Sequence, residues 1–386
     1  MQSVALSWLI YRLTGSALLL GTVGFAGQIP ILLLTPFAGV LADRWPLRRL
    51  VVATQSLALV QAALLAVLTL TKVIAVWHII ALSAVMGIIN AFDMPARQAF
   101  VAQMVEAPED LGNAIALNSF LVNGARLVGP SLAGLLIAWV GEGQCFVINA
   151  ISYIAVIVAL LAMTVKPFTA PHPPPFLRSL AAGFGYALGF APIRAVLMLL
   201  ATASLLGMSY ATVLPIFAGD ILSGGPRTYG FLLGATGLGA VSGALYLASR
   251  RSVLGLGRVI VFGAGAFGAG LIAVSFARSL SVALPLMLLV GLGMMLQIAS
   301  TNTFLQIVVE DDKRGRIMSL YTMAFIGMTP FGSLLAGAMA HSIGAPRTVL
   351  LGGLCCMIGA LLFARRLPAL RQLVLPIYAR KGILPA

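Results

Sequence analysis

The sequence predicts an all-α membrane protein made of two similar six-helix bundles, and three observations support this fold class. The first is composition: 60% of the 386 residues are hydrophobic and 9% are charged, against roughly 25% charged in soluble domains. The second is a series of apolar runs, each close to the ~20 residues that a helix needs to cross a bilayer. The third is an internal repeat, which predicts two halves in a parallel pseudo-two-fold relation.

The repeat aligns residues 103–141 with residues 306–344, a shift of 203 positions. Five of the aligned pairs are glycines: Gly112 and Gly315, Gly124 and Gly327, Gly129 and Gly332, Gly134 and Gly337, and Gly141 and Gly344. Glycines mark positions where main chains approach closely or turn sharply. Two such halves around an axis along the membrane normal are a transporter architecture, with the substrate site between them near the bilayer midplane.

The apolar runs give the predicted helices and domains. They cover residues 18–41, 50–70, 76–92, 115–140 and 146–165 in the first half, and 195–218, 229–248, 259–277, 282–304, 317–340 and 348–364 in the second. The repeat places the partner of the run at 195 before residue 1. Residues 1–11 are therefore predicted to be the outer half of a truncated first helix, with Trp8 and Tyr11 at the membrane interface. The predicted domains are an N-terminal bundle (1–166), a proline-rich cytoplasmic linker (167–178), a C-terminal bundle (179–366) and a cytoplasmic tail (367–386).

The distribution of basic residues predicts the orientation. The formal net charge is +14, which alone would also suit a nucleic-acid-binding protein. Of the 24 lysines and arginines, Arg126 falls inside a span and eighteen fall on one side of the predicted membrane. The five on the other side are Arg12, Lys72, Arg227, Arg278 and Arg347. The positive-inside rule places the richer side and the C-terminus in the cytoplasm. Because no basic stripe carries interleaved aromatic residues, we expect no nucleic-acid binding.

Residues suited to enzyme chemistry are scarce. The chain has three histidines and three cysteines, and each histidine falls in a loop or at a helix end. The stretch 263–268 matches the GxGxxG pattern of dinucleotide sites, but it lies inside an apolar run with no strand before it. We interpret these glycines as helix-packing positions. We therefore expect no enzyme activity, no cofactor and no metal site.

The loop after the second predicted helix, residues 39–50, carries the first informative motif. Its small, acidic and basic members are Gly39, Asp43, Arg44, Arg48 and Arg49. The aspartate can cap a helix or pair with an arginine, and the arginines fix the cytoplasmic face. The loop resembles the signature of the major facilitator superfamily, although Pro46 and Leu47 stand where that pattern has a glycine and an arginine.

A second motif, made of Gly129, Pro130 and Gly134, resembles the helix-bend signature that exporters of this superfamily carry in the fifth helix. Proline bends a helix and small residues admit a close neighbour. The stretch could therefore form a seam that rocks during transport, and ordinary small-residue packing is the alternative. Ala125 stands where the exporter pattern has a glycine.

Three further stretches, residues 92–100, 118–126 and 312–320, resemble the branch that contains the bacterial enterobactin exporter and related drug and siderophore efflux proteins. The resemblance extends from Met1 to Leu367. It implies the major facilitator fold, with twelve helices in the intact form, in a bacterial inner membrane. It also implies a monomer that exports a small amphipathic molecule by proton antiport and alternating access.

Polar residues within the spans are candidates for a substrate cavity or for coupling. Arg126 lies near the middle of its span, where a charge costs ~2.5–3.5 kcal/mol, so it should face the protein interior. Three roles stay open: an ion pair with Asp93 or with the missing part of the first helix, contact with an anionic substrate, and proton coupling. The other candidates, which either line the cavity or only bond between helices, are Gln28, Asn90, Asn118, Asn123, Asn149 and Gln297.

Charged residues at helix ends of both halves predict a cytoplasmic gate. Asp43 and Asp93 can pair with Arg97, Arg314 or Arg316 when the inner side closes. Two alternatives to the export of a soluble molecule remain. One is a lipid or lysolipid flippase of the same fold. The other is a non-transporting membrane scaffold, or a defective product of the shortened first helix.

Overall fold

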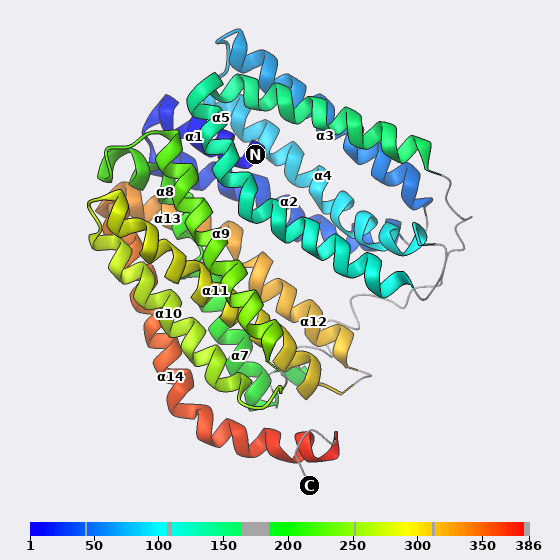
Figure 1. Cartoon of the computed structure of the whole chain (residues 1–386), viewed down its shortest axis with the longest axis vertical. Helices are drawn as coiled ribbons and strands as arrows, with labels where there is room; N and C mark the ends of the chain where they lie inside the picture. The colour runs from blue at the N-terminus through cyan, green and yellow to red at the C-terminus, as the bar shows by residue number, and fades with distance from the viewer. Residues whose placement is uncertain are drawn as a thin grey trace.

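The chain forms a helical bundle that divides into two groups of helices. A computed structural model describes residues 1–42, 45–105, 110–163, 185–187, 189–250, 252–310 and 313–381. All regular structure in these ranges is helical, which confirms the predicted all-α class. Figure 1 shows the helices of the first part of the chain, in blue to teal, beside those of the second part, in green to red. The predicted linker, residues 167–178, lies outside the described ranges.

The helices of each group follow one another along the chain. The first group comprises α1 (Gln2–Thr14), α2 (Ala17–Ala42), α3 (Leu47–Leu70), α4 (Val76–Gln103) and α5 (Leu111–Ala162). The second comprises α7 (Ala191–Thr202), α8 (Tyr210–Ile216), α9 (Pro226–Ser249), α10 (Leu256–Phe276), α11 (Leu280–Val308), α12 (Arg314–Thr322), α13 (Thr329–Ile343) and α14 (Ala345–Arg380). Three π-helical turns interrupt the second group: Ala203–Gly207, Phe217–Ile221 and Met323–Gly327. Such wide turns inside helices are frequent at functional sites.

Ten helices in the described part of the chain are long and apolar enough to cross a membrane. One of them lies in α5, which joins the predicted fifth span (115–140) and the start of the sixth (146–165) without an intervening loop. The chain turns between these two spans at Gly141, where φ is 83° and ψ is 170°. Within the described residues, the apolar runs read from the sequence are helical apart from a few end and turn residues, and the short α1 precedes them.

Gly141 and its repeat partner Gly344 take the same unusual conformation. Gly344 has φ 86° and ψ 154° and separates α13 from α14. Only glycine occupies this region without a steric penalty of ~1–3 kcal/mol. Each glycine joins two membrane helices in a single residue, so the repeat read from the sequence corresponds to a repeated turn in the structure.

Glycines also set the spacing of helices inside the second group. A Cβ atom at Gly263 of α10 would lie 2.9 Å from the carbonyl oxygen of Gly293 in α11. A Cβ atom at Gly268 would lie 2.9 Å from the carbonyl oxygen of Gly353 in α14. Both approaches are too close for any larger residue. The interpretation of the GxGxxG match as helix packing is confirmed for Gly263 and Gly268, whereas Gly265 has open space where a Cβ atom would be.

Helix α14 continues well beyond the last predicted span. It runs from Ala345 to Arg380, so most of the stretch predicted as a tail belongs to a helix. Leu370, Val374 and Tyr378 recur every four residues and are buried in the core of the second group. That spacing places all three on one helix face. Figure 1 shows this end of α14, in red, turning across the ends of its neighbours.

Candidate functional site

Buried apolar side chains join the two groups at one end of the described structure. A large hydrophobic core there contains residues of both, including Leu9 and Ile137 of the first group and Phe217 and Leu232 of the second. We call this the outer end; it carries Gly141 and the other loops poor in basic residues. Figure 1 shows the groups in contact here and diverging toward the starts of α3 and α12.

The opposite end, which we call the inner end, has a separate core in each group. One core contains Leu47, Leu50 and Phe100 of the first group. The other contains Phe304 and Ile317 of the second group, together with the buried face of α14. The loops at this end carry most of the basic residues. It is the predicted cytoplasmic side.

Helices α5 and α9 meet through a seam of small residues. A Cβ atom at Gly134 would lie 2.6 Å from the Cα atom of Gly230 and 2.7 Å from the carbonyl oxygen of Pro226. The hydroxyl of Ser131 faces the Cα of Gly234 and donates a 3.4 Å hydrogen bond to the Gly230 carbonyl oxygen. Gly129, in contrast, has open space where a Cβ atom would be. Within the predicted helix-bend motif, it is Gly134 that makes the close contact.

Helices α2 and α13 form the corresponding seam on the other side. A Cβ atom at Gly21 would lie 2.6 Å from the carbonyl oxygen of Ser333 and 2.9 Å from the Cα atom of Gly337. The rings of Phe25 and Phe331 contact edge to face, with centroids 6.1 Å apart. Gly337 is the repeat partner of Gly134, so each seam places one glycine of the repeat against a glycine of the other group. This arrangement agrees with a pseudo-two-fold relation between the groups.

Helix α1 adds aromatic and polar contacts to the outer end. Trp8 is buried and stacks on Tyr229 of α9, with ring centroids 6.1 Å apart. The Tyr11 hydroxyl donates a 2.6 Å hydrogen bond to the carboxylate of Asp220, which lies in the π-helical turn Phe217–Ile221. Trp8 was expected at the membrane interface. It lies between the two groups instead, because α1 packs mainly against α5 and turns the Trp8 ring toward Tyr229 of α9.

The inner end of the first group is held by a buried carboxylate. Asp93 of α4 is 4% exposed, and its Oδ1 accepts hydrogen bonds from Thr54 Oγ1 (2.8 Å) and Gln55 Nε2 (2.7 Å) of α3. Its Oδ2 forms an ion pair with Arg97, one turn along α4. Arg97, Arg314 and Arg316 were the predicted gate partners of Asp93, and Arg97 is the one that it contacts among the described residues. Thr54, Gln55 and Arg97 all belong to the first group.

The other predicted gate residues are distributed around the inner end. Arg48 donates a 2.6 Å hydrogen bond to the carbonyl oxygen of Leu161 and so ties α3 to the end of α5. Arg49 is exposed at the start of α3, and Arg314 and Arg316 are exposed at the start of α12. Gly39 lies in the last turns of α2. Asp43 and Arg44 lie outside the described residues.

One of the predicted cavity residues belongs to a chain of buried and partly buried amides in the first group. Asn149 of α5 donates a 2.6 Å hydrogen bond to Gln2 of α1. Gln2 in turn donates to Gln61 of α3 (2.7 Å), and Gln61 donates to the carbonyl oxygen of Leu82 in α4 (3.0 Å). Asn149 therefore bonds between helices. Such bonds between membrane helices contribute on average ~0.6 kcal/mol each.

The remaining predicted cavity residues have varied surroundings. Gln297 is buried and lies 3.5 Å from the carbonyl oxygen of Leu199, so it ties α11 to α7. Gln28 and Asn90 are half-buried, and Asn118 is exposed. The side chains of Asn123 and Arg126 lie outside what the structure describes.

Several contacts of the site involve residues that we did not single out in the sequence. Arg12 and Glu142 form an ion pair at 2.7 Å between the end of α1 and the turn at Gly141, and Glu142 is almost fully buried. Gln61 and Asp220 are two further examples. A polar residue inside an apolar run was the available signal for Gln61. The partners of Arg12 and Asp220 lie 130 and 209 residues away, and no local pattern marks them.

Comparison with known proteins agrees with this architecture. A family model described as a transmembrane secretion effector of the major facilitator superfamily matches residues 1–375. The chain is 26% identical to a staphyloferrin A transporter of Staphylococcus aureus, over 93% of this chain and 90% of that protein. It is also 26% identical to the multidrug efflux pump Tap of Mycolicibacterium fortuitum, over 96% and 92% of the two chains.

Solved structures show the same fold at low sequence identity. A variant of the nucleoside transporter NupG superposes with a TM-score of 0.75 and 11% identity, over 94% of both chains. The relatives are membrane transporters and not enzymes, as the scarcity of catalytic residues predicted. With the family match covering nearly all of the helical bundle, this chain belongs to the transmembrane secretion effector family of the major facilitator superfamily.

Proposed function

We propose that this protein exports a small amphipathic molecule, a siderophore or a drug-like compound, across the bacterial inner membrane by proton antiport. The observation that carries the proposal is the pair of glycine seams, which close one end of the interface between the two groups while the other end keeps separate cores. Relatives named for siderophore transport and multidrug efflux support the substrate class.

The closed seams at one end and the separate cores at the other support alternating access as the mechanism. The described conformation is shut at the outer end, so we assign it to the state open toward the cytoplasm. The groups would rock about the α2–α13 and α5–α9 contacts, parting at the outer end as the inner end closes. Glycine contacts suit this motion because they consist of van der Waals packing, and parting them leaves few polar groups without partners.

Arg126 is the residue that we propose for substrate contact or proton coupling in the cavity. Its place in α5, eight residues before Gly134, puts it on the inner side of the seam. The test is export by Arg126→Ala and Arg126→Lys proteins at matched expression. We expect export to fail in the alanine variant. Normal export by that variant would remove Arg126 from the mechanism.

The test of the function itself is proton-driven uptake into inverted membrane vesicles, with a panel of siderophores and cationic dyes. We expect the vesicles to take up at least one compound. This uptake should stop when a protonophore dissipates the proton gradient. Uptake that ignores the gradient would contradict proton antiport. Movement of fluorescent lysolipid between leaflets, with no uptake of any soluble compound, would favour the flippase alternative.

A further inference from the structure

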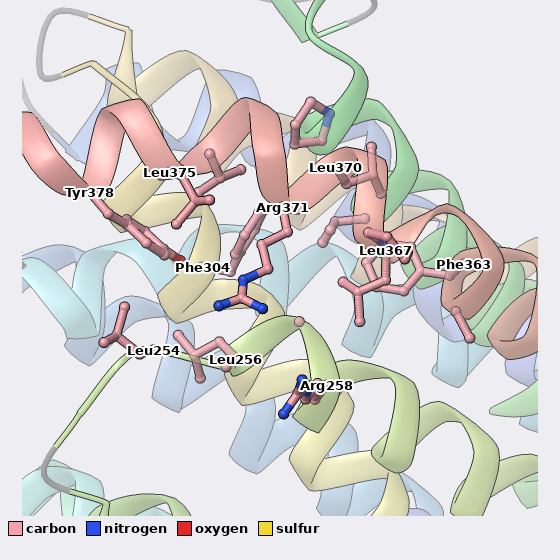
Figure 2. Close-up of a pocket in the computed structure, with 17 residues that line it drawn as sticks. Leu254, Leu256, Arg258, Phe304, Phe363, Leu367, Leu370, Arg371, Leu375 and Tyr378 are labelled. Atoms are coloured by element: carbon pink, nitrogen blue, oxygen red, sulfur yellow. The ribbon is translucent and has the colours of Figure 1, made fainter. Parts of the chain in front are cut away.

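Besides the interface between the groups, the second group contains a cavity of its own at the inner end. Its volume is about 480 Å³, within the range of sites for small ligands. The end of α14 forms one wall, from Phe363 to Tyr378, and the start of α10, with Leu254 and Leu256 before and within it, forms the opposite wall. Figure 2 shows the two walls facing each other.

The cavity combines apolar walls with two cations. Phe304, Phe363 and Val374 are among the buried apolar side chains that line it. Arg371 of α14 reaches across the space toward Leu256, and Arg258 lies on the same side as Leu256 (Figure 2). None of the 17 residues that line the cavity is acidic.

No acidic side chain among the described residues pairs with either arginine. Among the hydrogen bonds and ion pairs of the described residues, none involves Arg258 or Arg371. A neighbouring arginine behaves differently: Arg250 donates a 2.7 Å hydrogen bond to the carbonyl oxygen of Leu254 and so braces the wall. Arg258 and Arg371 are therefore available to a ligand, while Arg250 shapes the site.

We propose that this cavity binds an anionic phospholipid of the cytoplasmic leaflet, with the phosphate between Arg258 and Arg371 and an acyl chain along the apolar wall. A basic pocket between membrane helices on the cytoplasmic side suits such a head group. The buried face of the last turns of α14 packs against the inner end of the second group, which is the level at which lipid head groups of the cytoplasmic leaflet lie. The proposal uses the predicted orientation and does not depend on transport.

The experiment uses the purified full chain in detergent. Its melting temperature is measured with phosphatidylglycerol and with phosphatidylcholine of the same acyl chains, and bound lipids are counted by native mass spectrometry. We expect phosphatidylglycerol to raise the melting temperature further, and the Arg258→Gln/Arg371→Gln protein to lose most of that difference. We expect the phosphatidylglycerol occupancy of this double variant to fall by a factor of about five or more, which corresponds to a loss of ~1 kcal/mol in binding free energy.

The matched control is Arg365→Gln/Arg366→Gln, which removes two exposed cations from the same helix outside the cavity. It should keep the full difference between the two lipids. An equal loss in the control would mean a diffuse basic surface and would overturn the proposal. Unchanged binding by the Arg258→Gln/Arg371→Gln protein would overturn it as well.

A second variant tests the acyl-chain half of the site. Leu375→Trp narrows the cavity and leaves both arginines in place, so we expect it to lose phosphatidylglycerol binding too. This variant also keeps the test decisive should the double arginine variant fail to fold. Full binding by Leu375→Trp, or an equal stabilisation by glycerol phosphate without acyl chains, would exclude a lipid in this cavity.

Discussion

At the outer end, the two groups of helices touch through glycine main chain, whereas at the inner end Asp93 ties two helices of one group together through polar side chains. The two contacts differ in the free energy that is needed to separate the helices. Parting glycine seams loses van der Waals contacts, while parting Thr54 and Gln55 from Asp93 would leave buried polar groups unpaired, at ~1–3 kcal/mol each. In the proposed mechanism, the outer end opens and the Asp93 cluster stays rigid.

Breaking a seam should have the largest effect. In a Gly134→Leu protein the new side chain meets the main chain of Gly230, which cannot give way. Overpacking of this kind costs ~1–3 kcal/mol, and at ~1.4 kcal/mol per factor of ten the closed outer end should become about tenfold or more less populated. Spin labels at Val73 and Ser279, in a cysteine-free background, should report longer distances across the outer end.

The matched control for the seam is Gly129→Ala, in the same helix and with open space at the new Cβ atom. It should leave the label distances and vesicle uptake close to those of the unaltered chain. Equal effects of Gly129→Ala and Gly134→Leu would mean that α5 responds to any substitution, and the seam would lose its special place.

Removing the Asp93 carboxylate should come next in size. Asp93→Ala leaves Thr54 and Gln55 as buried groups without their acceptor, so we expect a loss of about 2 kcal/mol in unfolding free energy and a lower melting temperature in detergent. Asp93→Asn keeps one acceptor oxygen and should recover most of that stability.

The same pair of variants separates a gate from a structural tie. Should Asp93 take part in closing the inner end, Asp93→Asn would be stable and still transport poorly. Spin labels at Trp45 and Ser252 would then show an altered distribution across the inner end. Normal transport by Asp93→Asn would reduce this carboxylate to a role in stability.

A smaller effect is expected from the hydrogen bond between Tyr11 and Asp220. Tyr11→Phe keeps the ring against Trp8 and removes the bond across the groups, which is worth about 1 kcal/mol at a partly exposed position. In the distances between the spin labels at Val73 and Ser279, the ratio of the open to the closed population should rise about fivefold. An unchanged distribution would show that the seams alone close this end.

The smallest effect should come from Ser131→Ala. Its hydrogen bond to the Gly230 carbonyl oxygen is long, at 3.4 Å, so we expect a change below ~0.5 kcal/mol in stability and normal uptake. A loss comparable to that of Gly134→Leu would mean that hydrogen bonding, and not the approach of main chains, holds the seam.

Much of the fold was readable in the sequence, because hydrophobic runs and paired glycines are local signals. The apolar runs located the membrane helices, and Gly141 with Gly344 marked two equivalent turns. The candidate site was less accessible. Gly134 was predicted as part of a seam, but nothing near it in the sequence identifies Gly230 as its partner. The burial of Trp8 was also missed, because an aromatic residue near a helix end suits a membrane interface equally well.

By itself the sequence determined that this chain lies in a membrane, that it repeats, and where its basic loops and the glycines of the repeat fall. These properties depend on composition and on spacing along the chain. Their physical causes, the need of apolar residues for lipid and the steric limits of the main chain, act locally and do not require the fold. The tertiary structure alone decided which residues meet: Gly134 with Gly230, Tyr11 with Asp220, Gln2 with Gln61, and Arg258 with Arg371 around one cavity. Such pairings join positions far apart in the chain, and they exist only once whole helices have packed.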